Sequence, residues 1–289
     1  MADLKALKQI EVAKSKLADK AVAGFVGELE SILKRLNRRV AALLKALETD
    51  GDGRLVSDAA NLARASQARS QISRLLQESG YGNAAANLVA AYDEMAVLSK
   101  AGLAAGGVLA EFTRLDIASI QALKDMDFGR WARFGDDFVE SVHANIMDSV
   151  VGLSTFDGLV DSIQETLLGG DEQDRAAAVG RAETMANTLA QSFDRTLTAR
   201  KAAESGIDTF VYLGPEDGLT RPFCQAVLSG DGDKEFNIPA TENGVYTLEQ
   251  IEAMDNGVPG LQVLQFGGGY NCRHKFEAVA GKVAQEAAA

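Results

Sequence analysis

The sequence has few of the residues that disulfide frameworks, β-sandwiches and membrane spans require. Its 289 residues include 2 cysteines, Cys224 and Cys272, too few for the disulfide framework of a small secreted domain. Aromatic residues make up 6%, and an apolar content of mainly alanine, leucine and valine favours close-packed helices over a β-sandwich. The longest nearly apolar run, Ala101–Ala110, is too short and too rich in glycine to cross a bilayer. Since the first residues lack an apolar signal core, we expect folding in a reducing cytoplasm.

The charge of the chain is acidic overall and unevenly distributed. The formal net charge is −12, yet basic residues outnumber acidic ones in residues 1–80. A protein that binds nucleic acid over a broad surface needs a basic face, so this class is disfavoured. The only segment that offers such a face holds Lys34, Arg35, Arg38 and Arg39. Any contact with DNA is therefore expected at this segment.

Apolar residues recur at helical spacing through the first two thirds of the chain. Between Leu4 and Leu47 they step by three or four residues without a proline, which predicts one long helix. A turn over Glu48–Ser57 follows, with Ser57 as the expected N-cap of the next helix. Further helices are predicted around Leu62–Leu76, Leu88–Leu98, Ala104–Leu123, Phe134–Val150, Leu159–Leu167 and Asp171–Glu204.

The pattern changes after Gly206. Residues Ile207–Leu213 are β-rich, Thr247–Gln250 is a capping box that opens a short helix to Asn256-Gly257, and Leu261–Phe266 and Cys272–Val279 alternate like strands. The expected fold is therefore mainly α, a long helical N-terminal region followed by a small α+β C-terminal module. The predicted parts are an extended helical region at 1–170, the module with its leading long helix at 171–281, and a frayed tail at 282–289.

Two glycine-containing motifs resemble ligand sites without completing one. Asp50, Asp52 and Gly53 fit the start of an EF-hand loop, but the position of its bidentate glutamate is Ala59. This stretch is therefore interpreted as a surface turn. Gly267–Gly269 lies between two predicted strands, whereas a phosphate-binding loop precedes a helix, so it is interpreted as a tight connection.

The cysteines and one histidine leave several interpretations open. Cys272 and His274 are two residues apart on a predicted strand and would share a face. Together with Cys224, and with Asp217 as a conceivable fourth ligand, they could bind zinc, although the paired spacing of structural zinc sites is absent. A thiol-dependent hydrolase or effector would use Cys224 and His274. The simplest interpretation is that both cysteines are buried core residues.

Charged residues flank the same positions. An aspartate and an arginine in a tight loop commonly hold the loop through charge-assisted hydrogen bonds, which is the expected role of Asp217, Thr220, Arg221 and Arg273. We predict that one stabilising centre forms where two distant segments meet. Its members are Asp217, Arg221, Cys224, Cys272, Arg273 and His274.

Three stretches together resemble a known family. They are the helical Arg181, Glu183 and Thr184, the segment Gly206–Cys224, and the closing Gly269–His274. Over about residues 175–281 the chain resembles the Mu F-type minor head proteins of tailed phages, also called phage head morphogenesis proteins. The motif positions of the resemblance are Asp217, Thr220, Arg221, Cys224, Asn271, Cys272, Arg273 and His274. The family often has His in place of Cys224, and Pro-His where this chain has Gly269-Tyr270.

The resemblance implies a structural protein of the virion. Such a protein would associate with the portal and other head proteins, inside the head or near the portal, after assembly in the host cytoplasm. It would act in head assembly or maturation and in DNA packaging or delivery, with no catalytic residue, metal or cofactor. Self-association through the N-terminal helix is a further expectation. A zinc-stapled binding module and the thiol hydrolase or effector remain the alternatives.

Overall fold

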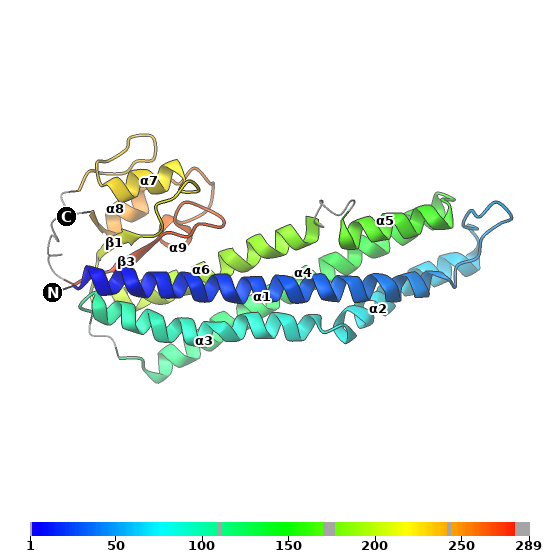
Figure 1. Ribbon diagram of the computed structural model, residues 1–289, viewed down its shortest axis with the longest axis horizontal. Helices are drawn as coiled ribbons and strands as arrows, with labels where there is room; N and C mark the ends of the chain where they lie inside the picture. The colour runs from blue at the N-terminus through cyan, green and yellow to red at the C-terminus, as the bar shows by residue number, and fades with distance from the viewer. Residues whose placement is uncertain (1, 109–110, 170–176, 242–243, 281–289) are drawn as a thin grey trace. The chain divides into compact units, whose positions relative to one another are not determined.

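The computed structural model describes residues 2–108, 111–169, 177–241 and 244–280 (Figure 1). Within these ranges the protein is mainly α-helical with a small antiparallel sheet near the C-terminus, which confirms the predicted fold class. The helices are α1 (Leu4–Leu44), α2 (Ala59–Glu78), α3 (Tyr81–Ala105), α4 (Arg114–Val151), α5 (Phe156–Leu168), α6 (Ala177–Glu204), α7 (Pro222–Ser229), α8 (Leu248–Ala253) and α9 (Val263–Phe266). The strands are β1 (Thr209–Leu213), β2 (Val245–Thr247) and β3 (Lys275–Ala278).

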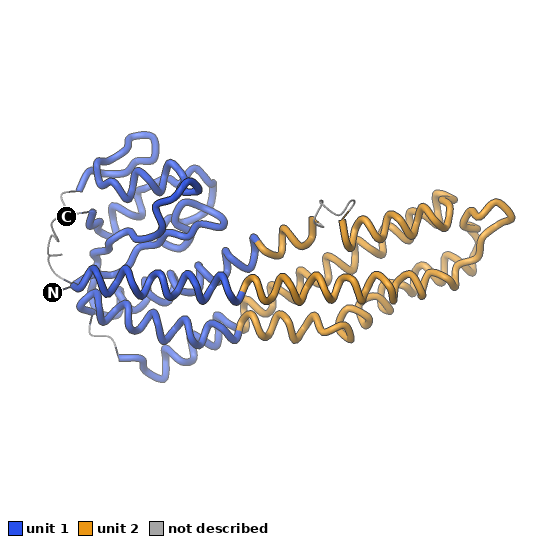
Figure 2. The backbone as a smooth tube through the Cα atoms, viewed as in Figure 1, with its two compact units in different colours: residues 1–21, 90–124, 184–289 blue, residues 22–89, 125–183 orange. Residues whose placement is uncertain are grey.

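The chain divides into two compact units that are not consecutive in sequence (Figure 2). Unit 1 consists of residues 1–21, 90–124 and 184–289, and unit 2 of residues 22–89 and 125–183. Helices α1, α3, α4 and α6 contribute residues to both. The predicted boundary at residue 170 and the predicted tail at 282–289 lie outside the described residues, so both stay predictions.

The described part of unit 2 consists of helices and their connections, and its core includes Trp131, the single tryptophan of the sequence. Trp131 is fully buried, with its ring centroid 4.5 Å from that of Phe25, and its carbonyl accepts a hydrogen bond of 2.7 Å from the Tyr81 hydroxyl. The surface turn before α2 is present as predicted, but its cap is different. Asp58, not Ser57, is the N-cap residue, because its carboxylate accepts from the Asn61 N–H at 2.8 Å.

The break between α3 and α4 is longer than predicted. A helix was expected from Ala104 onward, yet α3 ends at Ala105 and α4 begins only at Arg114. Gly107, with φ +77°, ends α3, and Gly106 allows a close contact, since a Cβ at Gly106 would overlap the backbone carbonyl of Ala278 in β3. Gly106 therefore lets the chain pass directly against the sheet.

Unit 1 contains the three-stranded sheet, with strand order β2-β1-β3 and both pairs antiparallel. Side chains alternate between its faces. Phe210, Tyr212 and Phe276 belong to the core shared with α7 and α8, whereas Val211 packs with Leu7 of α1 on the other face. Both faces are therefore covered, and all four residues of β3 are buried.

Two local predictions in the C-terminal part are wrong. Residues 261–266 do not form a strand, because 263–266 form the short helix α9, which stops at Gly267 with φ +55°. The last strand starts at Lys275, so Cys272 and His274 lie in the segment before it and not on the strand. The Thr247–Gln250 capping box is confirmed, with α8 ending at Ala253, somewhat before the predicted end.

Candidate functional site

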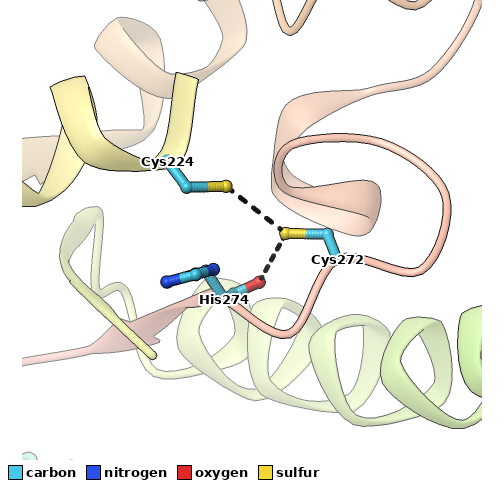
Figure 3. Close-up of side chains that lie close together, drawn as sticks. All are labelled: Cys224, Cys272 and His274. Carbon is cyan, nitrogen blue, oxygen red and sulfur yellow. Dashed lines mark hydrogen bonds between the residues drawn. The ribbon is translucent and has the colours of Figure 1, made fainter. Parts of the chain in front are cut away.

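Two sequence-distant segments meet at the cysteines. Cys224 lies in the first turn of α7, behind a proline at Pro222, and Cys272 lies just before β3. Their sulfurs are 3.7 Å apart, both thiols are free, and both residues are buried (Figure 3). The predicted contact between the two segments is therefore confirmed. We call Cys224, Cys272 and His274 the thiol centre.

The two thiols have different electrostatic surroundings. Cys272 Sγ accepts a hydrogen bond of 3.2 Å from the Gly268 N–H. Hydrogen bonding with Cys224 lowers the pKa of Cys272 well below its usual value in spite of burial, and the Arg195 guanidinium acts in the same direction. The same hydrogen bond, together with burial, raises the pKa of Cys224. Cys224 is therefore the weaker acid of the two thiols, which argues against Cys224 as an activated nucleophile.

Glycines shape the wall around the sulfurs. A Cβ on Gly268 would lie 2.6 Å from Cys224 Sγ, and a Cβ on Gly267 would lie 3.0 Å from Cys272 Sγ. The glycine run that was interpreted as a tight connection thus also lets the backbone close over both thiols.

Replacing Gly268 with alanine is expected to destabilise the protein by about 1–3 kcal/mol, because the added methyl overpacks against Cys224. The measurement is urea unfolding followed by far-ultraviolet circular dichroism. Gly218→Ala is the matched control, since a Cβ there meets nothing within 4 Å. It should change stability by less than about 0.5 kcal/mol. Equal effects of the two substitutions would contradict the close approach of Gly268 to the thiols.

His274 is fixed by its neighbours. Its Nε2 lies 2.8 Å from the Pro215 carbonyl oxygen, and its ring stacks on Tyr212 with centroids 5.6 Å apart. A Cβ on Gly214 would overlap the imidazole. The ring is therefore held against the strand β1 by packing on two sides and by one hydrogen bond.

Arg195 of α6 holds the segment that carries the second cysteine. Its guanidinium donates to the carbonyls of Gln265, Cys272 and His274 at 3.1, 2.7 and 2.6 Å. The side chain is buried. Sequence reasoning missed this residue, because a single arginine on a long amphipathic helix gives no signal of what it contacts.

The other predicted motif residues form a second set of bonds. Arg273 donates to both carboxylate oxygens of Asp217 at 2.7 and 2.8 Å, and Arg221 donates to the carbonyls of Gly268 and Tyr270 at 2.6 Å each. Thr220 Oγ1 donates to the Pro215 carbonyl at 3.0 Å. The loop before α7 and the segment before β3 are thus tied together on the surface as well as at the thiols.

The Asp217–Arg273 pair predicts a specific titration. Hydrogen bonds from Arg273 and from the Leu219 backbone lower the pKa of Asp217 to about 2. Because this folded-state pKa lies below the ordinary value of about 3.9, the pair stabilises the protein above pH 4 and stops doing so as the pH falls through 2. Carboxyl-carbon NMR should show a midpoint near 2. The midpoint should move toward 3.9 in Arg273→Gln and stay in place in Arg221→Gln; an unmoved midpoint in Arg273→Gln contradicts the assignment.

The remaining motif residues divide between the two units. Asn271 has φ +62°, and its N–H donates to Thr188 Oγ1 of α6 at 3.1 Å. Arg181 and Glu183 belong to unit 2, and Thr184 is exposed at the start of the α6 part of unit 1. Thr188, Asp194 and Arg195 of the same helix bond to residues of the C-terminal segment.

A buried cluster of five charges lies on the other face of the sheet. The Lys14 ammonium is 2.9 Å from Glu11, 3.1 Å from Asp194 and 2.9 Å from Glu277, and Lys275 pairs with Glu11 at 2.5 Å and with Asp194. Burial lowers the pKa of Lys275 to about 8. Burial also raises the pKa of Asp194 by more than the nearby Lys14 lowers it.

The charge cluster is compensated by its own side chains. Its three carboxylates, those of Glu11, Asp194 and Glu277, have the close spacing that a metal site needs. Two ammonium groups already lie among them, so the cluster has the balance of an ion-pair network and not of a cation site. Sequence reasoning missed it because Lys275 and Glu277 look like the solvent-facing positions of a half-buried strand.

A surface pocket of about 380 Å³ adjoins the thiol centre. Its wall includes the three residues of that centre and the polar side chains of Asn187 and Gln191 from α6. The remaining lining residues are Asp19, Leu219, Arg221, Asn271 and Arg273. The thiol centre is thus buried under side chains but borders a space that solvent can enter.

Comparison with family models, curated proteins and solved structures finds no match for this chain. Within the described ranges, no helix combines the length and apolar character that a bilayer crossing needs.

Proposed function

We propose that this protein is a structural minor head protein of a tailed phage that associates with the portal and acts in head assembly. The proposal is supported by one observation above all: the two motif segments, which are far apart in sequence, are in contact. The Asp217–Cys224 segment and the Asn271–His274 segment, which carry the resemblance to Mu F-type proteins, contact each other through side chains from both. These contacts support the interpretation that the motif residues hold the two ends of the C-terminal module together.

The bonds of two motif arginines and of Arg195 support a holding role. Arg195 and Arg221 donate to backbone carbonyls, and Arg273 is paired with Asp217 through both carboxylate oxygens. Guanidinium groups that are used in this way stabilise a fixed backbone shape. In this proposal the module has no turnover and presents a rigid surface to a larger assembly.

Two exposed apolar residues flank the motif on the surface. Leu219 is 79% exposed and Tyr270 is 53% exposed. Leu219 precedes Thr220, which bonds to the Pro215 carbonyl, and Tyr270 precedes Asn271, whose N–H bonds to Thr188. Large apolar side chains that remain exposed beside a rigid site are the kind of contact that protein interfaces use. We propose this surface as the one that contacts the portal.

A basic face for DNA receives less support from the structure. Two of its four candidate residues are engaged within unit 2: Arg35 donates to the Ser79 carbonyl at 2.7 Å, and Arg39 pairs with Glu78. Lys34 and Arg38 are exposed. We therefore propose that the protein acts mainly through contacts with other head proteins and not through contacts with DNA.

The test is co-expression of the tagged full chain with the portal protein encoded by the same genome, followed by size-exclusion chromatography. The chain should elute with the portal ring. Leu219→Asp and Tyr270→Asp should weaken this co-elution by at least about 10-fold, as expected for interface anchors. Val97→Asp, at an exposed site of unit 1 outside the motif, is the matched control and should have no effect. A chain that stays monomeric beside its portal protein would overturn the proposal.

A further inference from the structure

Cys224, Cys272 and His274 bring two thiols and an imidazole to one point. Their ligand atoms all lie within 4.8 Å of one another, and all three residues are buried. In Figure 3 the two sulfurs point toward each other, with His274 beside them. We propose that this thiol centre binds one Zn²⁺ ion through Cys224 Sγ, Cys272 Sγ and His274 Nδ1.

The spacing of the sulfurs fits two ligands of one ion. Zinc–sulfur bonds of about 2.3 Å in a tetrahedral site place the two sulfurs about 3.8 Å apart. The observed separation between Cys224 Sγ and Cys272 Sγ is 3.7 Å. A disulfide would instead require about 2.05 Å. The sulfur pair therefore has the separation of zinc ligands without any movement of the backbone.

The imidazole has the arrangement of a metal-binding histidine. A backbone carbonyl can only accept, so Nε2 of His274 must donate to the Pro215 oxygen, 2.8 Å away. This bond fixes the tautomer and leaves the lone pair on Nδ1. Histidine ligands usually donate their second ring N–H to a carbonyl or carboxylate in this way. The ligand atom of His274 lies within 4.8 Å of both sulfurs, so the ring can supply the third protein ligand.

Hydrogen bonds to the sulfurs supply a second layer around the site. The Tyr212 hydroxyl donates to Cys224 Sγ at 3.4 Å, and the Gly268 N–H donates to Cys272 Sγ at 3.2 Å. Arg195 holds the backbone carbonyls of Cys272 and His274, so two of the ligands are positioned by one buried side chain. Such partners orient ligands and stabilise thiolate charge.

The fourth position faces the pocket of about 380 Å³ that the three ligands help to line. Asp217, the conceivable fourth ligand from the sequence, is held by Arg273 through both carboxylate oxygens. Water from the pocket is therefore the fourth ligand in this proposal. Three protein ligands and one water are compatible with tetrahedral zinc. This inference is independent of the portal association.

The experiment measures metal in the purified full chain. Elemental analysis after zinc loading and dialysis should give one zinc per chain, removable by a chelator. Cobalt loaded without air should produce an intense near-ultraviolet thiolate-to-metal band. The band should disappear in Cys224→Ser and in Cys272→Ser, and His274→Gln should lower zinc affinity by at least about 10-fold. Glu11→Gln is the control for the carboxylate cluster and should leave both readouts unchanged.

A wild-type measurement covers the case in which a cysteine variant does not fold. Zinc should protect both thiols of the folded wild-type chain from alkylation by iodoacetamide, and a chelator should remove this protection. Absence of the cobalt–thiolate band in folded wild-type protein would overturn the proposal. Equal zinc content in folded Cys224→Ser and wild type, or alkylation rates that zinc does not change, would overturn it as well.

Discussion

Replacing Lys14 with methionine is expected to lower the free energy of unfolding by about 3–5 kcal/mol, because removing one partner of a buried ion pair leaves the other charge without compensation. Lys14 is within 3.1 Å of three carboxylates, and its side chain is 1% exposed. The methionine fills a similar volume but leaves three buried carboxylates with only the Lys275 ammonium. Urea unfolding followed by circular dichroism measures the loss.

The loss should depend on pH in a defined direction. In the Lys14→Met protein the carboxyls lose a positive neighbour, so their folded-state pKa values rise above those of the unfolded chain. Acids whose pKa is raised by folding destabilise the fold increasingly as the pH rises above their unfolded value. The deficit relative to wild type should therefore be larger at pH 8 than at pH 5.

The matched control for this prediction is Lys124→Met in the same unit. Lys124 pairs with Asp93 at 2.7 Å, and the aspartate side chain is 66% exposed. Removing a pair whose carboxylate is exposed to solvent in this way should cost less than about 1 kcal/mol, although the Lys124 side chain itself is 16% exposed. Similar losses in the two variants, or a Lys14→Met deficit that is independent of pH, would show that the buried charges are not coupled as described.

Replacing Arg195 with methionine is expected to be comparably severe, at about 3–5 kcal/mol, because three backbone carbonyls lose a charged donor at once. Two of those carbonyls, on Cys272 and His274, belong to the segment that meets Cys224. The substitution should therefore lower the free energy of unfolding and also loosen the segment that contains Cys272 and His274. Local opening should raise the rate at which both cysteines react with a disulfide reagent by at least about 100-fold.

Thiol labelling and urea unfolding together check the Arg195 prediction. Arg200→Met is the control on the same helix, since its guanidinium is partly exposed and pairs with Glu204. It should leave thiol reactivity within about 3-fold of wild type. If Arg195→Met unfolds earlier but its thiols stay as protected as before, then Arg195 does not hold the segment before β3.

Most of the long helices were predictable because they bury a stripe that repeats every three to four residues, whereas α7 was not predicted and α9 was predicted as a strand. Helix α1 follows the apolar pattern from Leu4, and the Thr247–Gln250 capping box marks the start of α8. The strand predicted at 261–266 was wrong because alternation over a short apolar run does not distinguish a strand from one helical turn. Gly267, with its positive φ, ends that turn.

The candidate site was predictable in its members but not in its geometry. The two cysteines, Asp217 and Arg273 could be grouped because their residue types complement one another. Arg195, Gly268 and the charge cluster around Lys14 could not, since these roles depend on which elements pack together across long sequence separations. Local patterns carry no information about such tertiary partners.

Both the proposed function and the proposed zinc site require that the Cys224 and Cys272 segments meet within one chain. Treating chelator-washed protein with a mild thiol oxidant such as diamide, followed by non-reducing peptide mapping, tests this directly. Sulfurs 3.7 Å apart should join rapidly into one Cys224–Cys272 bond within a single chain, at a rate independent of protein concentration. Disulfide-linked dimers in place of that bond, or two thiols that remain free, would contradict the account.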